Sequence, residues 1–426
     1  MNRHAKGYKE IENQLGGALL SRLVKKFGGT SVADIDSIIN IADRVANTVS
    51  EGHKLVVVVS AMGSMTDELI RLVRNVGKCS DAREYDAAIS AGEQISSAIL
   101  SAALRNRGVP ARSFLGLQVP IKTDGQHGNA RIIRIGTKQL HDCMERGEVP
   151  VVAGFQGVSP DGSITTLGRG GSDVTAVALA AALNVDRCDI HTDVSGVYTA
   201  DPHVVPQARQ LETISFDEMM ELASSGARVL HIRSVELAKN FKIKVRVASS
   251  FNNNPGTLIV SENEVVEKQT VSAISSSHDE AKITLFGLVD GASAAARVFE
   301  PLAEANINVD MIVQNLSVEG NEASVTFTVP RGDLNYALET LENLKTQVGY
   351  ESVAHDAGIA KVSAIGVGMR SHAGVAQQMF SALASKGIAI EAISTSEIKI
   401  SVLIPEAYTE LAVRTLHEAY ELHNRK

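Results

Sequence analysis

The sequence lacks several features that would assign it to particular classes of protein. No run of apolar residues approaches the roughly 18 that a membrane-spanning helix needs. There is no tryptophan, and the three cysteines, Cys79, Cys143 and Cys188, are widely spaced and odd in number. Such a set favours neither a disulfide framework nor a zinc site, so we expect free thiols in a reducing cytoplasm.

An excess of positive charge is also missing. The chain has 41 lysine and arginine residues against 49 acidic ones, a formal net charge of −8. This balance argues against nonspecific binding to nucleic acid. The first residues, MNRHAKGYKEIENQL, are too charged for a signal peptide and contain no apolar segment. We expect residues 1–22 to be a flexible N-terminal extension and the protein to be cytoplasmic.

What is present is enough apolar sequence for two or three domains, because 44% of the 426 residues are hydrophobic. Its most informative stretch is TTLGRGGSD, residues 165–173, which lies between the apolar run Val149–Phe155 and the alanine-rich run Val174–Leu183. This order predicts a strand, a glycine-rich turn and a helix. Glycines let backbone approach a ligand closely, and a helix N-terminus attracts anions. With Arg169 in the turn, we predict an anion site; the alternative is a tight structural turn.

Other predicted strands also end in small or charged residues, and helices follow them. These strands are Leu23–Phe27, Leu55–Val59 and Arg187–Thr192. The alternation predicts an α/β domain over residues 23–262 with a largely parallel sheet. Ligands of such sheets bind beyond the carboxyl ends of the strands. The side chains expected at this edge are Lys26, Ser60, Arg169 and Asp193.

Glu93 lies among small and apolar residues within a long helical pattern, Asp81–Arg107. A carboxylate is costly to bury unless it is paired. Glu93 therefore either faces solvent or holds a cation such as a substrate ammonium group.

The character of the sequence changes in the C-terminal part, residues 263–426. Here the order strand, helix, strand, strand, helix occurs twice, with a period near 80 residues. The pattern predicts two ferredoxin-like α+β modules, at about 280–350 and 359–426.

The sequence resembles the aspartate kinases of the amino-acid kinase superfamily in several of its motifs. The matching stretches are VKKFGGTSV, VVVSAMGSMTDEL, ISAGEQIS, VAGFQGV, TTLGRGGSDVTAV, HTDVSGVYTADP, NNPGTLI, VGMRSHAGVAQQMFSAL and ISTSEIKISVLI. The C-terminal modules resemble a pair of ACT domains. The resemblance implies an α/β three-layer sandwich around the sheet, the amino-acid kinase fold, followed by two ACT modules.

The resemblance also implies roles for individual residues. Glu93 would bind the ammonium group of aspartate and Arg169 its α-carboxylate. Lys26, Arg169 and Asp173 would be catalytic, and the substrate would be bound by Thr66, Glu93, Arg169, Gly170, Gly171 and Ser172. The nucleotide would be bound by Lys26, Phe27, Gly28, Gly29, Ser31, Ser60, Thr192, Asp193, Tyr198 and Asp201. His203 stands where many family members have arginine.

The implied reaction transfers the γ-phosphoryl group of ATP to the side-chain carboxylate of L-aspartate and gives 4-phospho-L-aspartate. This is the first step toward lysine, threonine and methionine. The carboxylate, with an ordinary pKa near ~3.9, is already ionised at neutral pH and needs no general base. Lys26 and Mg²⁺ would offset charge on the phosphoryl oxygens, with Mg²⁺ held mostly by phosphates and water. No protein ligand of the metal is assigned.

The ACT resemblance implies feedback control by lysine or threonine, and assembly as a homodimer or dimer of dimers. The positions that match an effector site in the first module are Asp290, Asn308, Asp310, Gln314 and Asn315. Their alternative role is to cap and connect elements. The turn Gly287–Ser293 lacks the family's proline-glycine pair, and Ala373 replaces a common proline. Two other functions stay open: a sibling kinase acting on glutamate-type substrates, and a non-catalytic ACT-based amino-acid sensor.

Overall fold

The computed structural model describes residues 21–77, 81–227, 229–265, 270–289, 291–316 and 322–424. The N-terminal extension up to residue 20, Cys79 and Asp290 lie outside the described residues. The chain forms two compact units. The first holds the residues up to Val197 together with Val229–Ser261, and the second holds Tyr198–Ala227 and the residues from Glu262 onward. Within the described part, no helix is both long and apolar enough to cross a membrane.

The first unit is built on a sheet whose strands run in the order β12-β11-β9-β1-β2-β6-β3. Neighbouring strands pair in parallel except β11 and β12. The strands are β1 (Arg22–Phe27), β2 (Lys54–Val59), β3 (Ala111–Phe114), β6 (Val149–Ala153), β9 (Arg187–Thr192), β11 (Val245–Ser249) and β12 (Thr257–Val260). The near-continuous valine run of β2 is typical of a strand buried on both faces.

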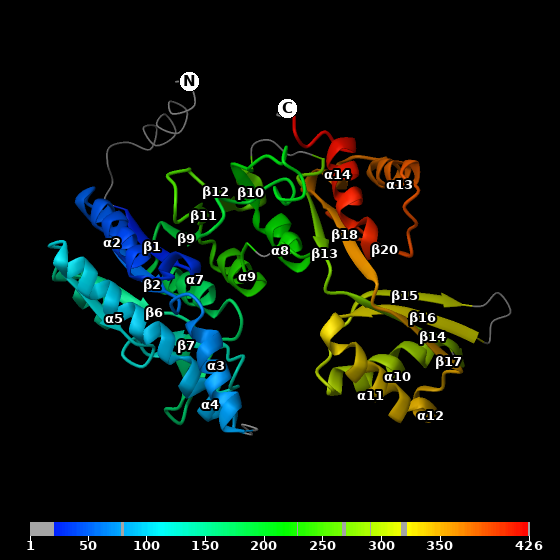
Figure 1. The fold of residues 1–426 in the computed structure, drawn as a ribbon, viewed down its shortest axis with the longest axis horizontal. Coiled ribbons are helices and arrows are strands. Elements are labelled where there is room, and N and C mark those ends of the chain that lie inside the picture. The colour runs from blue at the N-terminus through cyan, green and yellow to red at the C-terminus, as the bar shows by residue number, and fades with distance from the viewer. Residues whose placement is uncertain are drawn as a thin grey trace. The chain divides into compact units, whose positions relative to one another are not determined.

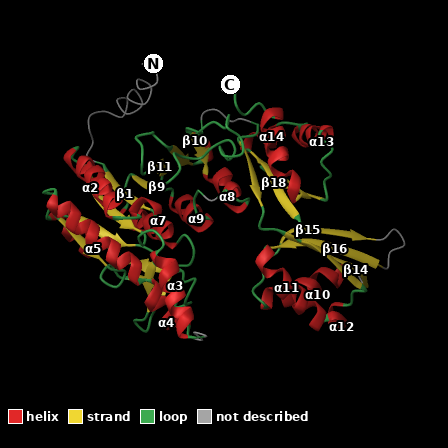
Figure 2. Cartoon of the chain, viewed as in Figure 1, coloured by secondary structure: helices red, strands yellow, loops and turns green. Residues whose placement is uncertain are grey.

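Helices cover both faces of this sheet (Figures 1 and 2). On one face, α2 (Ile35–Ser50) and α5 (Ala91–Asn106) pack on alternate residues of β1 and β2, including Leu23, Phe27 and Val57. On the other, α7 (Gly171–Leu183) contacts β1, β2 and β9, and α9 (Ile232–Phe241) packs on α7. The predicted three-layer sandwich is confirmed. Because strand side chains alternate, Lys26 faces α7 while Phe27 faces α2.

The structure departs from the sequence prediction at two places near the glycine-rich turn. The helical pattern Asp81–Arg107 is broken at Ser90 into α4 (Ala82–Ile89) and α5. A hairpin separates β6 from the turn, so the order is strand, hairpin, turn, helix. The hairpin strands β7 (Gln156–Val158) and β8 (Ile164–Thr166) extend a small sheet with β4 (Ile121–Thr123) and β5 (Ile132–Ile135). The remaining helices of this unit are η1 (Thr30–Val32), α3 (Met65–Val76) and α6 (Lys138–Glu145).

The first C-terminal module is a four-stranded antiparallel sheet in the order β15-β16-β14-β17, with helices on one face. Its elements are β14 (Ala281–Val289), α10 (Gly291–Glu304), β15 (Asp310–Leu316), β16 (Glu322–Val329), η3 (Arg331–Asp333), α11 (Leu334–Asn343), α12 (Lys345–Val348) and β17 (Ser352–Asp356). The predicted strand–helix–strand–strand–helix order is confirmed, and β17 adds a fourth strand.

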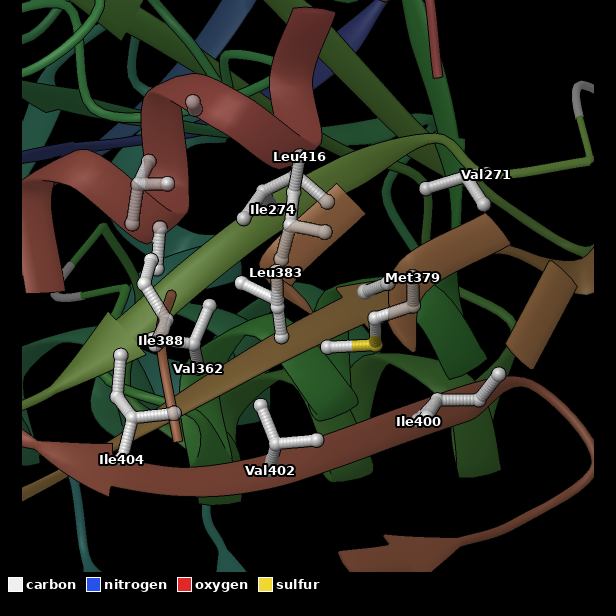
Figure 3. Packing of buried hydrophobic residues seen from close by; sticks show 14 of the residues in the cluster. Val271, Ile274, Val362, Met379, Leu383, Ile388, Ile400, Val402, Ile404 and Leu416 are labelled. Atoms are coloured by element: carbon white, nitrogen blue, oxygen red, sulfur yellow. The ribbon is translucent and has the colours of Figure 1, made fainter. Parts of the chain in front are cut away.

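The second module has a similar sheet in the order β13-β18-β20-β19. Its elements are β18 (Ile359–Ile365), η4 (Val367–Ser371), α13 (Val375–Ser385), β19 (Ala392–Thr395), β20 (Lys399–Pro405), η5 (Glu406–Tyr408) and α14 (Thr409–Ala419). Its fourth strand, β13 (Ala273–Ser277), comes from sequence that precedes the first module. Ile274 of this strand packs among Val362, Val402 and the helix residues of the core (Figure 3).

Residues 198–227 belong to the same unit as the C-terminal modules. They include β10 (Thr213–Ser215) and α8 (Phe216–Ser224), and 3-10 helix η2 (Glu262–Glu264) follows later in the chain. Ala200 and Val205 lie in the core of the second module. The buried Thr199 hydroxyl lies 2.9 Å from Nε2 of His417 on α14.

Candidate active site

A cavity of about 250 Å³ lies in the first unit, at the carboxyl ends of β1, β2 and β6. It is lined by Lys26, Gly29, Ser60, Ala61, Gly63, Thr66, Glu93, Phe155 and the run Gly168–Asp173. The structure therefore brings together residues that are far apart in the sequence and that were predicted to bind aspartate and the phosphoryl group. This follows from the fold, because side chains after parallel strands meet at one edge.

The glycine-rich turn forms one wall of the cavity. Gly168 and Gly170 have φ of +77° and +70°, backbone conformations that residues other than glycine rarely adopt. A Cβ at Gly170 would also lie 2.4 Å from Cβ of His231. Helix α7 begins directly after, at Gly171, so the positive end of its dipole lies at the cavity wall. The wall suits an anionic group.

Two opposite charges meet at the base of the cavity. Nζ of Lys26 lies 2.6 Å from Oδ1 of Asp173, in the first turn of α7, and both side chains are about nine-tenths buried. The contact is an ion pair and not a hydrogen bond, since Oδ1 of Asp173 accepts no hydrogen bond from the described residues. Pairing makes burial of both charges tolerable, because an isolated buried charge is very costly.

Glu93 is the most unusual residue of the site. It lies in the first turn of α5 and is 4% exposed, and its Oε2 has no hydrogen-bond partner among the described residues. Burial raises the pKa of Glu93 to about 7, against the lowering effect of backbone hydrogen bonds at Glu93 and Ala61 and of the charge of Lys26. A buried, unpaired acceptor that lines a cavity fits a cationic group of a ligand.

Arg169 and Thr66 complete the groups that face the cavity from its rim. Arg169 is exposed, and no residue in the described part of the chain forms an ion pair with it. It can therefore offer its guanidinium to a carboxylate. Glu93 and Arg169 together give one acceptor of ammonium and one donor to carboxylate, the two groups of an α-amino acid.

Phe155 is a site residue that sequence reasoning missed. Its φ is +69°, which is strained for a bulky side chain. Its N–H donates to Oγ1 of Thr175 at 3.1 Å, and its carbonyl accepts from the Leu167 N–H at 2.9 Å. These bonds hold the strained backbone against the glycine-rich turn. Strained backbone conformations are common at functional sites, but nothing in the sequence around Phe155 indicates one.

Only some of the predicted nucleotide-binding residues line this cavity. Lys26, Gly29 and Ser60 line it. The Phe27 side chain is buried on the opposite face of the sheet, against the α2 side, and stacks on His191. Only its backbone can reach the site.

The remaining nucleotide positions do not line this cavity, although a Cβ at Gly28 would lie 3.3 Å from Nζ of Lys26. The Gly28 N–H donates to the His191 carbonyl, and Oγ of Ser31 lies 2.5 Å from Oγ of Ser250. The Thr192 hydroxyl donates to the exposed Asp193 carboxylate. Tyr198 and Asp201 belong to the second unit. The nucleotide roles of all these residues stay predictions.

The predicted effector residues that are described lie on or just before β15 of the first module, and all four are exposed. They are Asn308, Asp310, Gln314 and Asn315. Asp310 is already engaged: its Oδ2 accepts from Nζ of the buried Lys361 at 2.7 Å, and Lys361 also lies 2.6 Å from Glu280. This ion pair joins β15 of the first module to β18 of the second.

A larger cavity, of about 530 Å³, lies in the second module between η4, the start of α13 and the β19–β20 turn. It is lined by Met369, Arg370, His372, Gly374, Val375, Ala376, Thr395, Ser396, Glu397 and Ile400. Arg370 and Glu397 form an ion pair on its wall, at 3.1 Å. The smaller cavity is the better candidate for the active site, because it gathers the buried Lys26, Glu93 and Asp173.

A resident metal centre is not indicated by the described residues, among which no group of three or more histidine, cysteine, aspartate or glutamate side chains could hold an ion. The buried Asp173 is paired with Lys26. This arrangement fits a cation that enters with a nucleotide and keeps phosphate and water ligands.

Comparison with known proteins agrees with the fold. Residues 21–249 match the amino acid kinase family, and residues 283–344 and 362–420 match the ACT domain. An aspartate kinase of Pseudomonas putida is 51% identical over 95% of this chain and 98% of its own length. An aspartokinase of Corynebacterium glutamicum is 46% identical over 95% of this chain and 97% of its own.

Solved structures give the same result. Escherichia coli aspartokinase III, in complex with aspartate and ADP (R-state), has a TM-score of 0.79 at 29% identity, covering 93% of this chain and 99% of that one. The same enzyme in complex with lysine and aspartate (T-state) has a TM-score of 0.73 at 29% identity, covering 93% and 98%.

The fold, the site and these matches define the class of the protein: the chain belongs to the amino-acid kinase family. Within it, the chain belongs to the aspartate kinases that carry two C-terminal ACT domains. The resemblance found in the sequence motifs is thus confirmed.

Proposed function

We propose that the smaller cavity binds L-aspartate with its ammonium group on Glu93, its α-carboxylate on Arg169 and its side-chain carboxylate toward Lys26. The observation that carries this proposal is the buried, unpaired Oε2 of Glu93 in the same cavity as Lys26, Arg169 and Asp173. An ammonium group would supply the missing partner of Glu93 and offset the cost of burying its charge. The related Escherichia coli enzyme was solved with aspartate in both of its complexes named above.

The reaction needs positioning and charge neutralisation more than covalent help from the protein. A side-chain carboxylate oxygen of aspartate attacks the γ-phosphorus of ATP. The bond from this phosphorus to the β,γ-bridging oxygen breaks, and ADP leaves with the electron pair. Lys26 lies where it can offset charge on the transferred group, and Asp173 holds Lys26 in place. The positive end of the α7 dipole would also favour the anionic oxygens.

ATP as the phosphoryl donor is supported by the ADP in the related complex. Mg²⁺ would accompany the nucleotide and offset charge on its phosphates. Lys26, Gly29 and Ser60 would border the γ-phosphate, since they line the cavity at the ends of β1 and β2.

The proposed reaction has a direct test, because hydroxylamine traps an acyl phosphate as a hydroxamate. Purified protein is incubated with magnesium-ATP, hydroxylamine and either L-aspartate or L-glutamate. We expect hydroxamate with aspartate alone, and a loss of at least 100-fold in the Lys26→Met variant. Product with glutamate would favour the sibling kinase, and no product with either substrate would favour a sensor without catalysis.

The ACT modules support control by an amino acid, and lysine is bound in the related T-state complex. We propose that lysine or threonine binds the C-terminal modules of this chain. The exposed residues of β15 and the cavity of the second module are the two candidate places. Arg370 and Glu397 pair with each other at this cavity, and Arg370 also pairs with Glu262. The two charged groups of an amino acid would replace the contact between Arg370 and Glu397.

The assembly proposed for the chain is a homodimer or a dimer of dimers formed through the ACT modules. Ile312 on β15 and Ile393 on β19 are exposed apolar residues on edge strands of the two sheets, which is consistent with pairing. Light scattering of the purified protein would give the mass directly. A monomer at micromolar concentration would contradict this proposal.

A further inference from the structure

The glycine-rich turn that carries Arg169 is held from behind by residues outside the cavity. The buried residue on one side is Asp86 of α4, which is 0% exposed. Its Oδ1 accepts a hydrogen bond from the Thr166 hydroxyl at 2.6 Å, and its Oδ2 accepts from the Thr166 N–H at 2.9 Å. Thr166 comes two residues before Gly168. A fully buried carboxylate thus fixes both the backbone and the side chain at the entry to the turn.

Asp86 also fixes a second loop against the same turn. Its carboxylate accepts from the Gly128 N–H at 2.9 Å and lies 3.0 Å from Nδ1 of His127. The Ala130 N–H in turn donates to the Thr166 carbonyl at 2.9 Å. The loop at residues 127–130 therefore forms a backing layer for the turn. Gly168 packs closely on it, because a Cβ at Gly168 would lie 2.9 Å from Oδ1 of Asn129.

Arg233, at the start of α9, holds the same layer from the other side. Its guanidinium donates to the Leu167 carbonyl at 2.6 Å, to Oδ1 of Asn129 at 2.8 Å and to the Ala130 carbonyl at 2.9 Å. Leu167 is the residue between Thr166 and Gly168. Asp86 and Arg233 thus fix two consecutive residues of the turn, with charged hydrogen bonds, which are stronger than neutral ones.

We propose that Asp86 and Arg233 are positioning residues for the aspartate site. They act through the backbone of Thr166 and Leu167 to place Arg169 for the substrate α-carboxylate. Neither side chain lines the cavity, so neither touches the reacting groups. The proposal rests on the proposed function of Arg169. Its physical basis is that a flexible glycine-rich turn needs external supports, and that small displacements of a binding group cost much activity.

The test compares Asp86→Asn and Arg233→Lys with a matched control, Asp124→Asn. Asp124 lies next to the same loop and accepts hydrogen bonds from the N–H groups of Gln126 and Arg131; it reaches Arg233 only through its charge and does not bond to the turn. We expect kcat/KM for aspartate to fall about 10- to 100-fold in Asp86→Asn and Arg233→Lys. KM for ATP should stay within twofold, and the control should match the wild type.

Two further variants make the result decisive. Thr166→Val removes one hydrogen bond to Asp86 with little change in size, and tests the proposal if Asp86→Asn fails to fold. In an Arg169→Gln background, Asp86→Asn should cost little more aspartate affinity, measured by calorimetry, because both changes act through one group. Folded Asp86→Asn or Thr166→Val protein with kcat/KM for aspartate within twofold of wild type would overturn the proposal. So would an equal rise in both KM values.

Hydrogen exchange separates this inference from the proposed function. Peptides covering residues 163–172 should exchange faster in Asp86→Asn than in Asp124→Asn, whatever reaction the wild type performs. Unchanged hydrogen exchange in Asp86→Asn, together with unchanged kinetics, would refute the positioning role of Asp86 and leave the proposed function untouched. Absence of aspartyl hydroxamate from the wild type would refute the proposed function and, with it, the role of Asp86 and Arg233 in aspartate binding, whereas faster exchange in Asp86→Asn would still show that Asp86 holds the turn.

Discussion

At the scale of single residues, the site contains charged side chains that are already buried in the ligand-free protein. Lys26 and Asp173 are paired, and Asp86 accepts four hydrogen bonds or close polar contacts from its neighbours. Glu93 is the exception, since burial raises its pKa to about 7 and one oxygen has no partner among the described residues. We interpret this as a binding group whose partner is the substrate.

The raised pKa of Glu93 predicts a pH dependence for aspartate binding. The ammonium group of aspartate needs the ionised carboxylate, which becomes protonated in the free enzyme as pH falls below about 7. The substrate's own carboxylate stays ionised down to about pH 5. We expect kcat/KM for aspartate to fall up to about tenfold per pH unit between pH 6.5 and 5. A flat profile from pH 5 to 8 would contradict the role of Glu93.

The raised pKa of Glu93 also predicts that this residue lowers the stability of the ligand-free protein while it serves aspartate binding. A carboxyl group whose pKa is higher in the folded than in the unfolded protein destabilises the fold as pH rises from about 4.5 to about 7, and this loss remains above pH 7. Glu93→Gln should therefore raise the free energy of unfolding of the ligand-free protein by up to about 3 kcal/mol at pH 8, and less at pH 5. Aspartate binding should weaken at least tenfold. Denaturation at the two pH values, with calorimetry, measures both effects; a variant less stable than wild type at pH 8 would refute the account.

At the scale of elements, the second ACT module depends on a strand that the chain supplies early. Strand β13 pairs with β18 over residues Ala273–Ser277, and the whole first module follows before β18 begins. The repeat of strand, helix, strand, strand, helix could not indicate this strand, because β13 precedes both repeats. Its sequence, AISSS, has little apolar pattern.

Ile274 tests the importance of this strand, because its side chain is 2% exposed in the module core. Ile274→Ala should lower the free energy of unfolding by about 2–4 kcal/mol, as expected for a buried isoleucine truncated to alanine. Tyr408→Ala in η5 of the same module is the control, since Tyr408 is 43% exposed and its truncation should cost less than about 1 kcal/mol. Urea unfolding followed by circular dichroism compares them. Equal losses would show that β13 is not part of the core that holds the module.

At the scale of the whole molecule, the division into compact units differs from the division of the sequence into domains. Residues 198–227 fall within the stretch that matches the amino acid kinase family, yet they pack with the ACT modules, where Ala200 and Val205 join the core. Tyr198 and Asp201, which resemble nucleotide-binding residues, belong to this segment. A regulatory module that shares its core with such a segment is suited to influence catalysis.

We therefore predict that lysine, threonine or both together inhibit the kinase at millimolar concentrations. The aspartyl hydroxamate assay measures this, with glycine at the same concentrations as the control for nonspecific effects. The stretch Gly287–Ser293, which lacks the family's proline-glycine pair, makes the choice of effector the informative outcome. Full activity with each amino acid, alone and in combination, would count against feedback control.

Much of the site could be predicted because its residues follow strands. A lysine near the end of β1, a serine after β2 and a glycine-rich turn before a helix must converge if the sheet is parallel, and they do. The strained Phe155 and the supports Asp86 and Arg233 could not be predicted. Their roles depend on which backbone groups lie near them in space, and the sequence spacing of those groups carries no periodic signal.

The sequence by itself determined the parallel sheet, the paired ACT modules and the identity of the charged residues at the site, since these follow from local pattern and motif order. Only the tertiary structure decided that Glu93 is buried with one carboxylate oxygen unpaired among the described residues, that β13 completes a module far along the chain, and that Asp86 and Arg233 contact the glycine-rich turn. The reason is physical: burial, strand pairing across long separations and hydrogen bonds between loops are set by packing of the whole chain, and no local stretch contains them.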